Sequence, residues 1–414
     1  MTKAEVAPHD LPEIDPTQEG WTVGLFIDQA FCRDPRPFYE RLRHFPPGRD
    51  DLRAMGQKPT VVVTKHQDVE FVFRNPQLFS SQFGEGMAGI GNERPLIPLQ
   101  IDPPDHKKYR VLLDPYFAPR EMAKLEPGLA TLTNSLIDKF IEQGSCDFVS
   151  EFAVPYPCQA FLELVGLPLD DLDHFLHIKE GIIRGHGSFD LEEAARNRAA
   201  AGQECYEYFE KALDEQLQGK REAGLMRRLL DAEVDGERLT RQEILDILFL
   251  FIIAGLDTVT DSLCCFFSYL AENSAHRDAL VKDPSVIPSA VEELLRWESP
   301  VAGVARVAAE DVELSGCPVK KGDSLLVFVG AANTDATALE AADRVEFDRE
   351  TNRHYAFGGG IHRCLGSHLA RTELRVAMRE WHRRIPEYRI EEGAELIWTP
   401  MLRAVHHLPL QWAV

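Results

Sequence analysis

The sequence lacks the features that mark secreted, membrane-spanning and nucleic-acid-binding proteins. Its eight cysteines form no CxxC pair and have no regular spacing, which indicates reduced thiols rather than a disulfide framework. The most apolar run, Ile247 to Leu256, is about half as long as the ~20 residues that cross a bilayer as a helix, so it predicts a core helix. Basic residues are outnumbered by acidic ones, 45 against 67, and the formal net charge of −22 leaves no large basic footprint for nucleic acid. We therefore expect neither a membrane anchor nor a nucleic-acid partner.

The N-terminal stretch resembles no targeting signal. Residues 1–18 are polar and acidic, without the basic start and apolar segment of a secretory signal or the arginines of a transit peptide. The chain is 44% hydrophobic and 27% charged, as globular proteins are, and no low-complexity linker divides it. We predict a cytoplasmic protein with a polar tail over residues 1–18 and one domain over residues 19–414.

Helical periodicity dominates, and strand-like runs are few. Apolar spacing predicts a helix over residues 34–45 and a mainly helical body over residues 120–334. Thr240 and Glu243 form a Thr-x-x-Glu capping box, which predicts that the longest helix begins there and continues to Asn273. β-Branched runs predict short strands near the C-terminus and over residues 60–64, 312–314 and 324–329. The expected fold class is mainly α with small β-sheets.

One cysteine lies in a glycine-rich loop. Residues 357–366 read Phe-Gly-Gly-Gly-Ile-His-Arg-Cys-Leu-Gly and precede a helical run over residues 367–385. A lone cysteine is usually an inert buried residue, but glycines on both sides allow the backbone to pass close to a flat group. The helix N-terminus and the neighbouring Arg363 predict a lowered pKa for Cys364. A thiolate is the ligand that a haem iron needs to cleave dioxygen.

This loop resembles the haem-binding signature of the cytochrome P450 family, Phe-Gly-x-Gly-x-(His/Arg)-x-Cys-x-Gly, at every fixed position. The resemblance implies a cytochrome P450 fold in a single domain, with haem b (iron protoporphyrin IX) buried between a long distal helix and the cysteine-loop helix. It implies that Cys364 is the metal ligand, with Ala254, Phe357 and Gly366 beside the haem. The sequence is most similar to the camphor-hydroxylase branch of bacterial members.

Two further motifs extend the resemblance. His106 and Arg110 match the family's His-x-x-x-Arg, and their i, i+4 spacing places both cations on one helix face. Without the resemblance, an ordinary solvated helix face would be the better interpretation. With it, these two residues, Arg306 and His362 are implied to bind the haem propionates. Glu293 and Arg296 resemble the family's Glu-x-x-Arg, an ion pair with a structural role, although alone the motif suggests an exposed pair worth under ~1 kcal/mol.

Residues 254–258, Ala-Gly-Leu-Asp-Thr, resemble the family's oxygen-activation motif in the middle of the expected long helix. Glycine costs ~1 kcal/mol in a helix interior, and the Thr258 hydroxyl can bond back to a carbonyl, so both loosen the helix. Asp257 follows an apolar stretch and must pair, hydrate or protonate. We predict that Asp257 and Thr258 relay protons, and that Arg184 holds Asp257, with His186 as an alternative partner.

Substrate contacts are implied by similarity in spacing alone. The glycine-rich loop over residues 84–91 is expected to form one edge of the pocket. Arg94 falls where camphor-type relatives place a tyrosine, and it either binds a substrate carboxylate or points to solvent. The remaining expected pocket residues are aliphatic or small and predict a small-to-medium hydrophobic substrate: Leu96, Leu99, Leu250, Ile253, Ala302, Val304, Met401 and Leu402.

The resemblance implies a monooxygenase that hydroxylates a terpenoid, a branched or fatty lipid, or an aromatic compound with O2. No flavin-binding or ferredoxin-like region is present, so a separate ferredoxin and its reductase would supply two electrons from NAD(P)H. Four arginines near the cysteine are either a docking patch for that partner or scattered surface charges: Arg353, Arg363, Arg371 and Arg375. Two alternatives remain, a peroxide-dependent peroxygenase that would not need the Asp257–Thr258 pair, and a haem-thiolate sensor that needs neither relay nor pocket.

Overall fold

Helices make up most of the chain, in line with the sequence. The computed structural model describes residues 21–50, 59–83, 91–92, 94–188, 190–219, 224–234 and 236–414. The predicted tail over residues 1–18 and residues 84–90 of the glycine-rich loop lie outside this part. The helices are α1 (Trp21–Ile27), α2 (Gln29–Arg33), α3 (Arg36–Arg43), α4 (His66–Arg74), α5 (Asp105–Leu113), α6 (Pro119–Ala123), α7 (Glu126–Ile137), α8 (Pro155–Val165), α9 (Leu172–Arg184), α10 (Leu191–Leu217), α11 (Leu225–Asp231), α12 (Arg241–Gly255), α13 (Asp257–Glu272), α14 (Ser274–Lys282), α15 (Ile287–Glu298), α16 (Val329–Asn333) and α17 (Ser367–Arg384).

The strands are short, and the largest sheet has five of them in the order β1-β2-β10-β7-β3. Strand β10 runs parallel to β2, and the other pairs of this sheet are antiparallel. The strands are β1 (Gly48–Asp50), β2 (Thr60–Val63), β3 (Phe79–Ser80), β4 (Ser145–Asp147), β5 (Glu233–Val234), β6 (Glu237–Arg238), β7 (Gly303–Ala308), β8 (Val312–Leu314), β9 (Cys317–Val319), β10 (Ser324–Phe328), β11 (Arg389–Ile390) and β12 (Pro409–Gln411). The predicted class, mainly α with small β-sheets, is confirmed.

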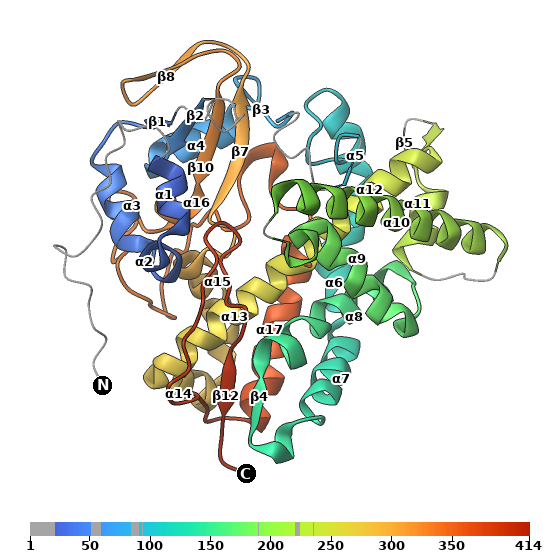
Figure 1. Cartoon of the computed structure of the whole chain (residues 1–414), viewed down its shortest axis with the longest axis vertical. Coiled ribbons are helices and arrows are strands. Elements are labelled where there is room, and N and C mark those ends of the chain that lie inside the picture. Colours follow the sequence, from blue (N-terminus) through green and yellow to red (C-terminus); the bar gives the residue numbers. More distant parts are fainter. Residues whose placement is uncertain are drawn as a thin grey trace.

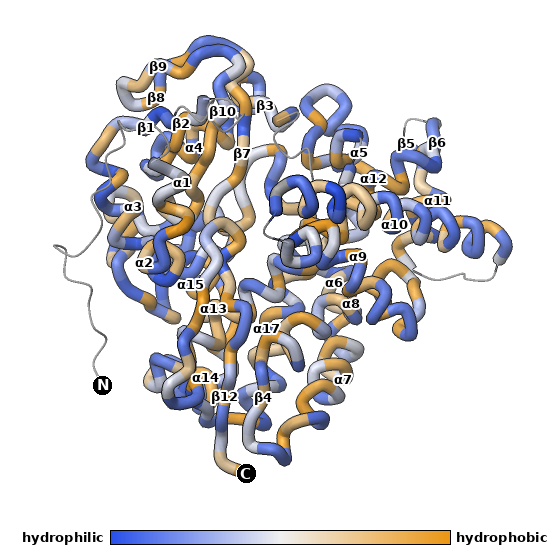
Figure 2. The backbone as a smooth tube through the Cα atoms, in the orientation of Figure 1, coloured by the Kyte–Doolittle hydropathy of each residue, from blue (hydrophilic) through white to orange (hydrophobic). Residues whose placement is uncertain are grey.

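The elements form a β-rich side and a larger helical side. Figure 1 shows the five-stranded sheet beside α1 to α4, while α5 to α12 occupy the opposite side and α13 crosses between them. In Figure 2 the strands β2 and β10 are strongly hydrophobic, whereas the outer helix α10 is largely hydrophilic. One core cluster centres on Trp381 of α17, which is fully buried and packs against the rings of Phe148, Phe152 and Phe267. This core packs α13 against α17, the helix that follows the cysteine loop.

The predicted long helix is two helices in line. The capping box is present, because the Thr240 hydroxyl accepts from the Glu243 backbone N–H at 3.2 Å and the Glu243 carboxylate accepts from the Thr240 N–H at 2.7 Å. Leu256 separates α12 from α13 with φ −93° and ψ −61°. The Thr258 hydroxyl donates to the Ala254 carbonyl at 2.9 Å, next to Gly255. The helix is therefore loosened where the sequence predicted.

As one unbroken helix the prediction is wrong, although the in-line run over residues 241–272 has 32 residues, more than any single described helix. Helix α10 has 27 residues, against 15 in α12 and 16 in α13, because the break at Leu256 divides the run. Together, residues 241–272 are the one described segment long and apolar enough to cross a membrane, but 78% of its most apolar window is buried inside the protein. Such burial is typical of a core helix, as the sequence predicted.

Candidate functional site

The cysteine loop connects the β-rich side to α17. The Cys364 backbone N–H donates to the Phe357 carbonyl at 2.9 Å, which closes the loop before α17 begins at Ser367. Gly360 has φ +66°, and a Cβ atom there would lie 2.0 Å from the Phe73 carbonyl oxygen. At this position, glycine is required because the loop presses against the end of α4. The sequence predicts that the loop glycines lie close to a flat group, but the close neighbour of Gly360 is the backbone of Phe73.

Cys364 differs from the other cysteines in its accessibility. All eight lie in the described residues, six of them are buried, Cys317 is half-buried, and the Cys364 side chain alone is exposed. Although part of the residue is open to solvent, loss of hydration among the surrounding protein groups raises the pKa of the Cys364 thiol above its usual range. The Gly366 backbone N–H and the charges of Arg110 and Arg363 oppose the shift. The predicted lowering of the pKa is wrong in direction, because burial outweighs the helix terminus and the arginines.

Two histidines and two arginines from three parts of the chain converge near this loop. The rings of His106 on α5 and His362 in the cysteine loop lie 4.2 Å apart between centroids. Arg306 on β7 is buried, and burial lowers its pKa to about 10. Burial, together with His106, Arg306 and Arg110, lowers the pKa of His362 to about 3. The fold therefore brings together the four residues that the family resemblance implies as propionate ligands.

This cluster has more donors than acceptors. The Nε2 atoms of His106 and His362 are buried and have no hydrogen-bond partner among the described residues. The Oδ1 atom of Asp102 is 3.9 Å from His362 Nε2, too far for a hydrogen bond. Arg110 is partly satisfied, because it pairs with Asp114 at 2.8 Å and donates to a loop carbonyl. A ligand with two carboxylates, as a porphyrin has, fits these orphaned donors.

Asp257 is the buried central charge of a second cluster. Its Oδ1 lies 2.5 Å from the Nζ atom of Lys179, and its Oδ2 lies 3.3 Å from Arg184 Nη2. The predicted contact with Arg184 is confirmed. The alternative partner, His186, instead stacks on the ring of His177 at 4.5 Å. Against the effect of burial, Asp257 raises the pKa of Arg184, which keeps this guanidinium charged.

Sequence reasoning missed Lys179. Helix α9 buries Phe175, Ile178 and Ile182, and Lys179 lies four residues after the first and three before the last, on the same apolar face. A lysine on a buried face needs a partner, since Lys is almost never fully buried unless paired. That pattern was the available signal, and it would have predicted a buried acidic partner for Lys179 without identifying it as Asp257.

Comparisons with known proteins agree with this geometry. The family model described as Cytochrome P450 matches residues 184–381. A probable cytochrome P450 127A1 of Sinorhizobium fredii is 34% identical over 359 residues, which cover 86% of this chain and 84% of that protein. The chain belongs to the cytochrome P450 family. It is therefore a haem-dependent monooxygenase, and the fold predicted from the sequence is confirmed.

Other relatives span the whole family domain. The mycinamicin IV hydroxylase/epoxidase of Micromonospora griseorubida is 32% identical over 366 residues, covering 85% of this chain and 89% of that enzyme. The crystal structure of CYP109E1 from Bacillus megaterium in complex with testosterone superposes with a TM-score of 0.81 at 29% identity, over 92% of this chain and all of that one. The chain is thus similar to P450 enzymes along most of its length.

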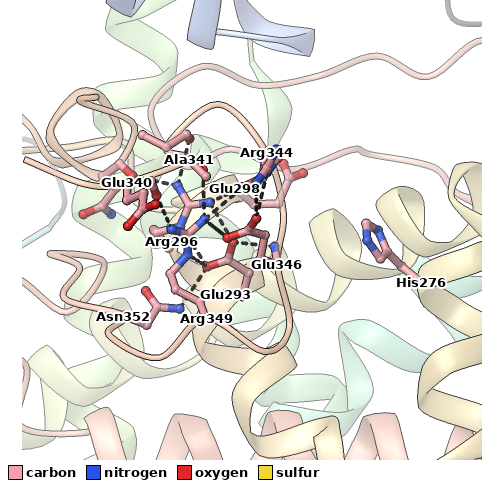
Figure 3. A network of polar contacts seen from close by, with 12 residues as sticks. His276, Glu293, Arg296, Glu298, Glu340, Ala341, Arg344, Glu346, Arg349 and Asn352 are labelled. Atoms are coloured by element: carbon pink, nitrogen blue, oxygen red, sulfur yellow. Dashed lines mark hydrogen bonds and ion pairs between the residues drawn. The ribbon is translucent and has the colours of Figure 1, made fainter. Parts of the chain in front are cut away.

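The Glu-x-x-Arg pair of this P450 is the centre of a buried network (Figure 3). Arg296 donates to both carboxylate oxygens of Glu293 at 2.8 Å and 2.7 Å, and neither side chain is exposed. Arg349 donates to the same two oxygens at 3.0 Å and 3.1 Å. Although burial opposes ionisation, these arginines hold the pKa of Glu293 below its usual range. The pair is structural as predicted, and it is buried rather than exposed.

Arg94 follows neither of its two predicted readings. Its guanidinium makes a two-point contact with Asp246 of α12, at 3.0 Å and 3.1 Å, and lies 5.0 Å over the ring of Tyr206 from α10. Asp246 is buried, and it also accepts from the Tyr206 hydroxyl at 3.0 Å. Arg94 therefore binds a carboxylate of the protein itself, and it ties its own segment to two helices.

The other expected pocket residues form two groups. Leu96 and Leu250 belong to one buried cluster, against which Leu99 and Ile253 pack. On the β-rich side, the Ala302 N–H donates to the Met401 carbonyl at 2.9 Å, and Val301 bridges Leu402. Ala254 is exposed in the last turn of α12, and Val304 on β7 is half-buried.

The arginines near Cys364 are not equivalent. Arg371 is held by both oxygens of Glu292 at 2.6 Å and 2.7 Å and lies 4.3 Å over the ring of Phe357. Arg375 is half-buried, and its Nε donates to the Arg371 carbonyl. Arg353 and Arg363 are exposed. Only part of the predicted patch is therefore open to a partner.

Proposed function

We propose that this P450 hydroxylates a small-to-medium hydrophobic compound, a terpenoid, a branched or fatty lipid, or an aromatic, with O2 and two electrons from a ferredoxin. The carrying observation is the buried Asp257 next to Thr258, held by two cations. A peroxide-dependent enzyme has no need of a proton route, and a sensor has no need of one either. We further propose a single haem domain over residues 19–414 and a cytoplasmic location.

Cys364 would hold the haem iron, because its side chain is the one exposed thiol and lies at the N-terminal side of α17. The orphaned donors of His106 and His362, with Arg306 and Arg110, would bind the two propionates. When bound, the haem activates dioxygen. Backbone and side chains at Ala254, Phe357 and Gly366 would border it.

The chain's own part in the chemistry is proton delivery. Arg184 is about one-third exposed and Asp257 is buried, so this ion pair connects solvent to the interior. Asp257 can take up a proton only when Arg184 releases it, which makes the pair a two-position switch. The Thr258 hydroxyl, now bonded to the Ala254 carbonyl, would rotate to pass the proton on. Lys179 contacts the other oxygen of Asp257 and would hold the side chain in place when Arg184 moves.

The substrate class is supported by the aliphatic residues on α12 and β7 and by the relative whose structure holds testosterone. A spectral binding screen of terpenoids, fatty acids and aromatics tests it, with a substrate-type shift of the Soret band as the expected result. If no lipophilic compound shifts the band, a sensor or binding protein is the better description.

The electron donor is supported by the exposed Arg353 and Arg363 near the cysteine loop in an otherwise acidic protein. We expect product from NAD(P)H only when ferredoxin and its reductase are present, with a reduction rate that falls as salt rises. Product formation with hydrogen peroxide but not with NAD(P)H and these proteins would favour the peroxygenase instead.

A further inference from the structure

Asp261 is a second buried carboxyl that the proposed proton route leaves unused. It lies one helical turn beyond Asp257 on α13, and this i, i+4 spacing places both side chains on one face with Cβ atoms about 5–6 Å apart. Asp261 is 2% exposed and Asp257 is 1% exposed. A carboxyl buried this deeply must pair with a cation or hold a proton.

The charges around Asp257 are balanced without Asp261. Lys179 and Arg184 supply two positive charges to the cluster. Asp257 supplies one negative charge, and Glu180 supplies another through its 2.8 Å contact with Arg184. An ionised Asp261 would add a buried negative charge with no cation of its own. Among the described residues, no group donates a hydrogen bond to its carboxyl.

The surroundings of Asp261 favour its neutral form. Burial raises its pKa well above the usual range, the charge of Asp257 raises it further, and Arg184 and Lys179 oppose the shift. These two residues of α9 are the only cations that act on it within the described chain. The other titratable neighbours are thiols of its own helix, Cys264 and Cys265, whose pKa values burial also raises.

We propose that Asp261 is a positioning residue of the proton relay, which stores one proton beside Asp257 inside the protein. This inference rests on the proposed role of Asp257. When Arg184 moves away, the proton leaves the Asp261 carboxyl and binds Asp257 Oδ2, an oxygen that accepts no hydrogen bond from the described residues. Asp261 becomes a carboxylate and is reprotonated from solvent beside Arg184 and Glu180. No electrons move in either transfer.

The stored proton is tested by infrared spectroscopy on the full-length haem-loaded protein at pH 7, with 13C-labelled aspartate. The label separates Asp261 from Glu373, another buried acid, whose pKa burial raises to about 8. We expect the carbonyl stretch of a protonated aspartic acid, shifted in D2O, and lost in Asp261→Asn. The matched control Asp278→Asn, at a position 66% exposed, should keep the band. A wild-type protein without this band, or a band that survives in Asp261→Asn, overturns the proposal.

Turnover rates of two variants distinguish the proton-storing role of Asp261 from the relay role of Asp257. Asp261→Asn keeps the shape of a neutral acid but cannot release a proton, so turnover should fall about tenfold, less than the ~10²-fold typical of a directly acting acid. The solvent deuterium effect should rise, and substrate affinity should not change. If Asp257→Asn is slow while Asp261→Asn turns over as the wild type does, the proposal for Asp261 is wrong and the proposed role of Asp257 stands. If Asp257→Asn itself turns over normally, the proposed relay fails.

Discussion

The network around Glu293 predicts a large loss of stability when its charge is removed. The carboxylate accepts six hydrogen bonds, four from Arg296 and Arg349, one from Asn352 and one from the Glu346 backbone. In Glu293→Gln, the guanidinium of Arg296 stays fully buried without a carboxylate, and its partners are one amide oxygen and three backbone carbonyls. Breaking a buried ion pair costs ~3–5 kcal/mol, and because those carbonyls remain, we expect a value near ~3 kcal/mol.

Urea unfolding of the haem-loaded protein, followed by circular dichroism at pH 7, measures this loss. It would be a large share of the ~5–15 kcal/mol that stabilises a typical protein. The matched control is Glu272→Gln, whose partner Arg33 is 3.9 Å away and mostly exposed, and which should cost under ~1 kcal/mol. A Glu293→Gln variant no less stable than this control would refute the reasoning.

The same pair fixes the pH dependence of that loss. The pKa of Glu293 is lower in the folded protein than in the unfolded chain, so its ionisation stabilises the fold above the unfolded value of ~4.3. This contribution is lost as pH falls through the folded pKa. The difference between wild type and Glu293→Gln should therefore be full at pH 7 and shrink progressively below pH ~4.

Three further substitutions probe the distal side. Thr258→Ala should still consume NAD(P)H with substrate bound but release much of it as hydrogen peroxide, because the hydroxyl no longer guides the proton; an unchanged yield of product per NAD(P)H would contradict this role. Asp257→Asn should slow turnover by about 10²-fold while substrate affinity, measured by spectral titration, stays the same; weak binding with normal turnover would mean that Asp257 shapes the pocket. Arg94→Ala should lower the free energy of unfolding by ~1–3 kcal/mol, because the buried Asp246 keeps, among the described residues, the Tyr206 hydroxyl and the Gln242 amide as its donors; unchanged urea unfolding would show that the contact carries no net stability.

Local signals in the sequence predicted local features well. The Thr240 capping box, the loosened helix at Gly255 and Thr258, and the cysteine loop each depend on residues within a few positions of one another. The contact of Arg184 with Asp257 is longer in range, and it was predictable because a buried carboxylate requires a cation. That Asp257 needs a cation followed from its burial, and the choice of Arg184 as that cation followed from the resemblance to the family.

Features that depend on packing were not predictable in the same way. Arg94 and Asp246 are 152 residues apart, and no local pattern joins them. The pKa of Cys364 is set by burial, which depends on how α5, α17 and the loop pack, so an argument from Arg363 and the helix terminus gave the wrong direction. Lys179 lay on a recognisable apolar face, but its partner required the fold.

The reduced carbon-monoxide difference spectrum of the purified protein tests the central claim most directly. If Cys364 supplies a thiolate to the haem iron, the wild type shows the red-shifted Soret band of thiolate-ligated haem, and Cys364→His loses it while still binding haem. Cys317→Ser, at the next most accessible cysteine, should keep the band. A red-shifted band that persists in Cys364→His would contradict the account.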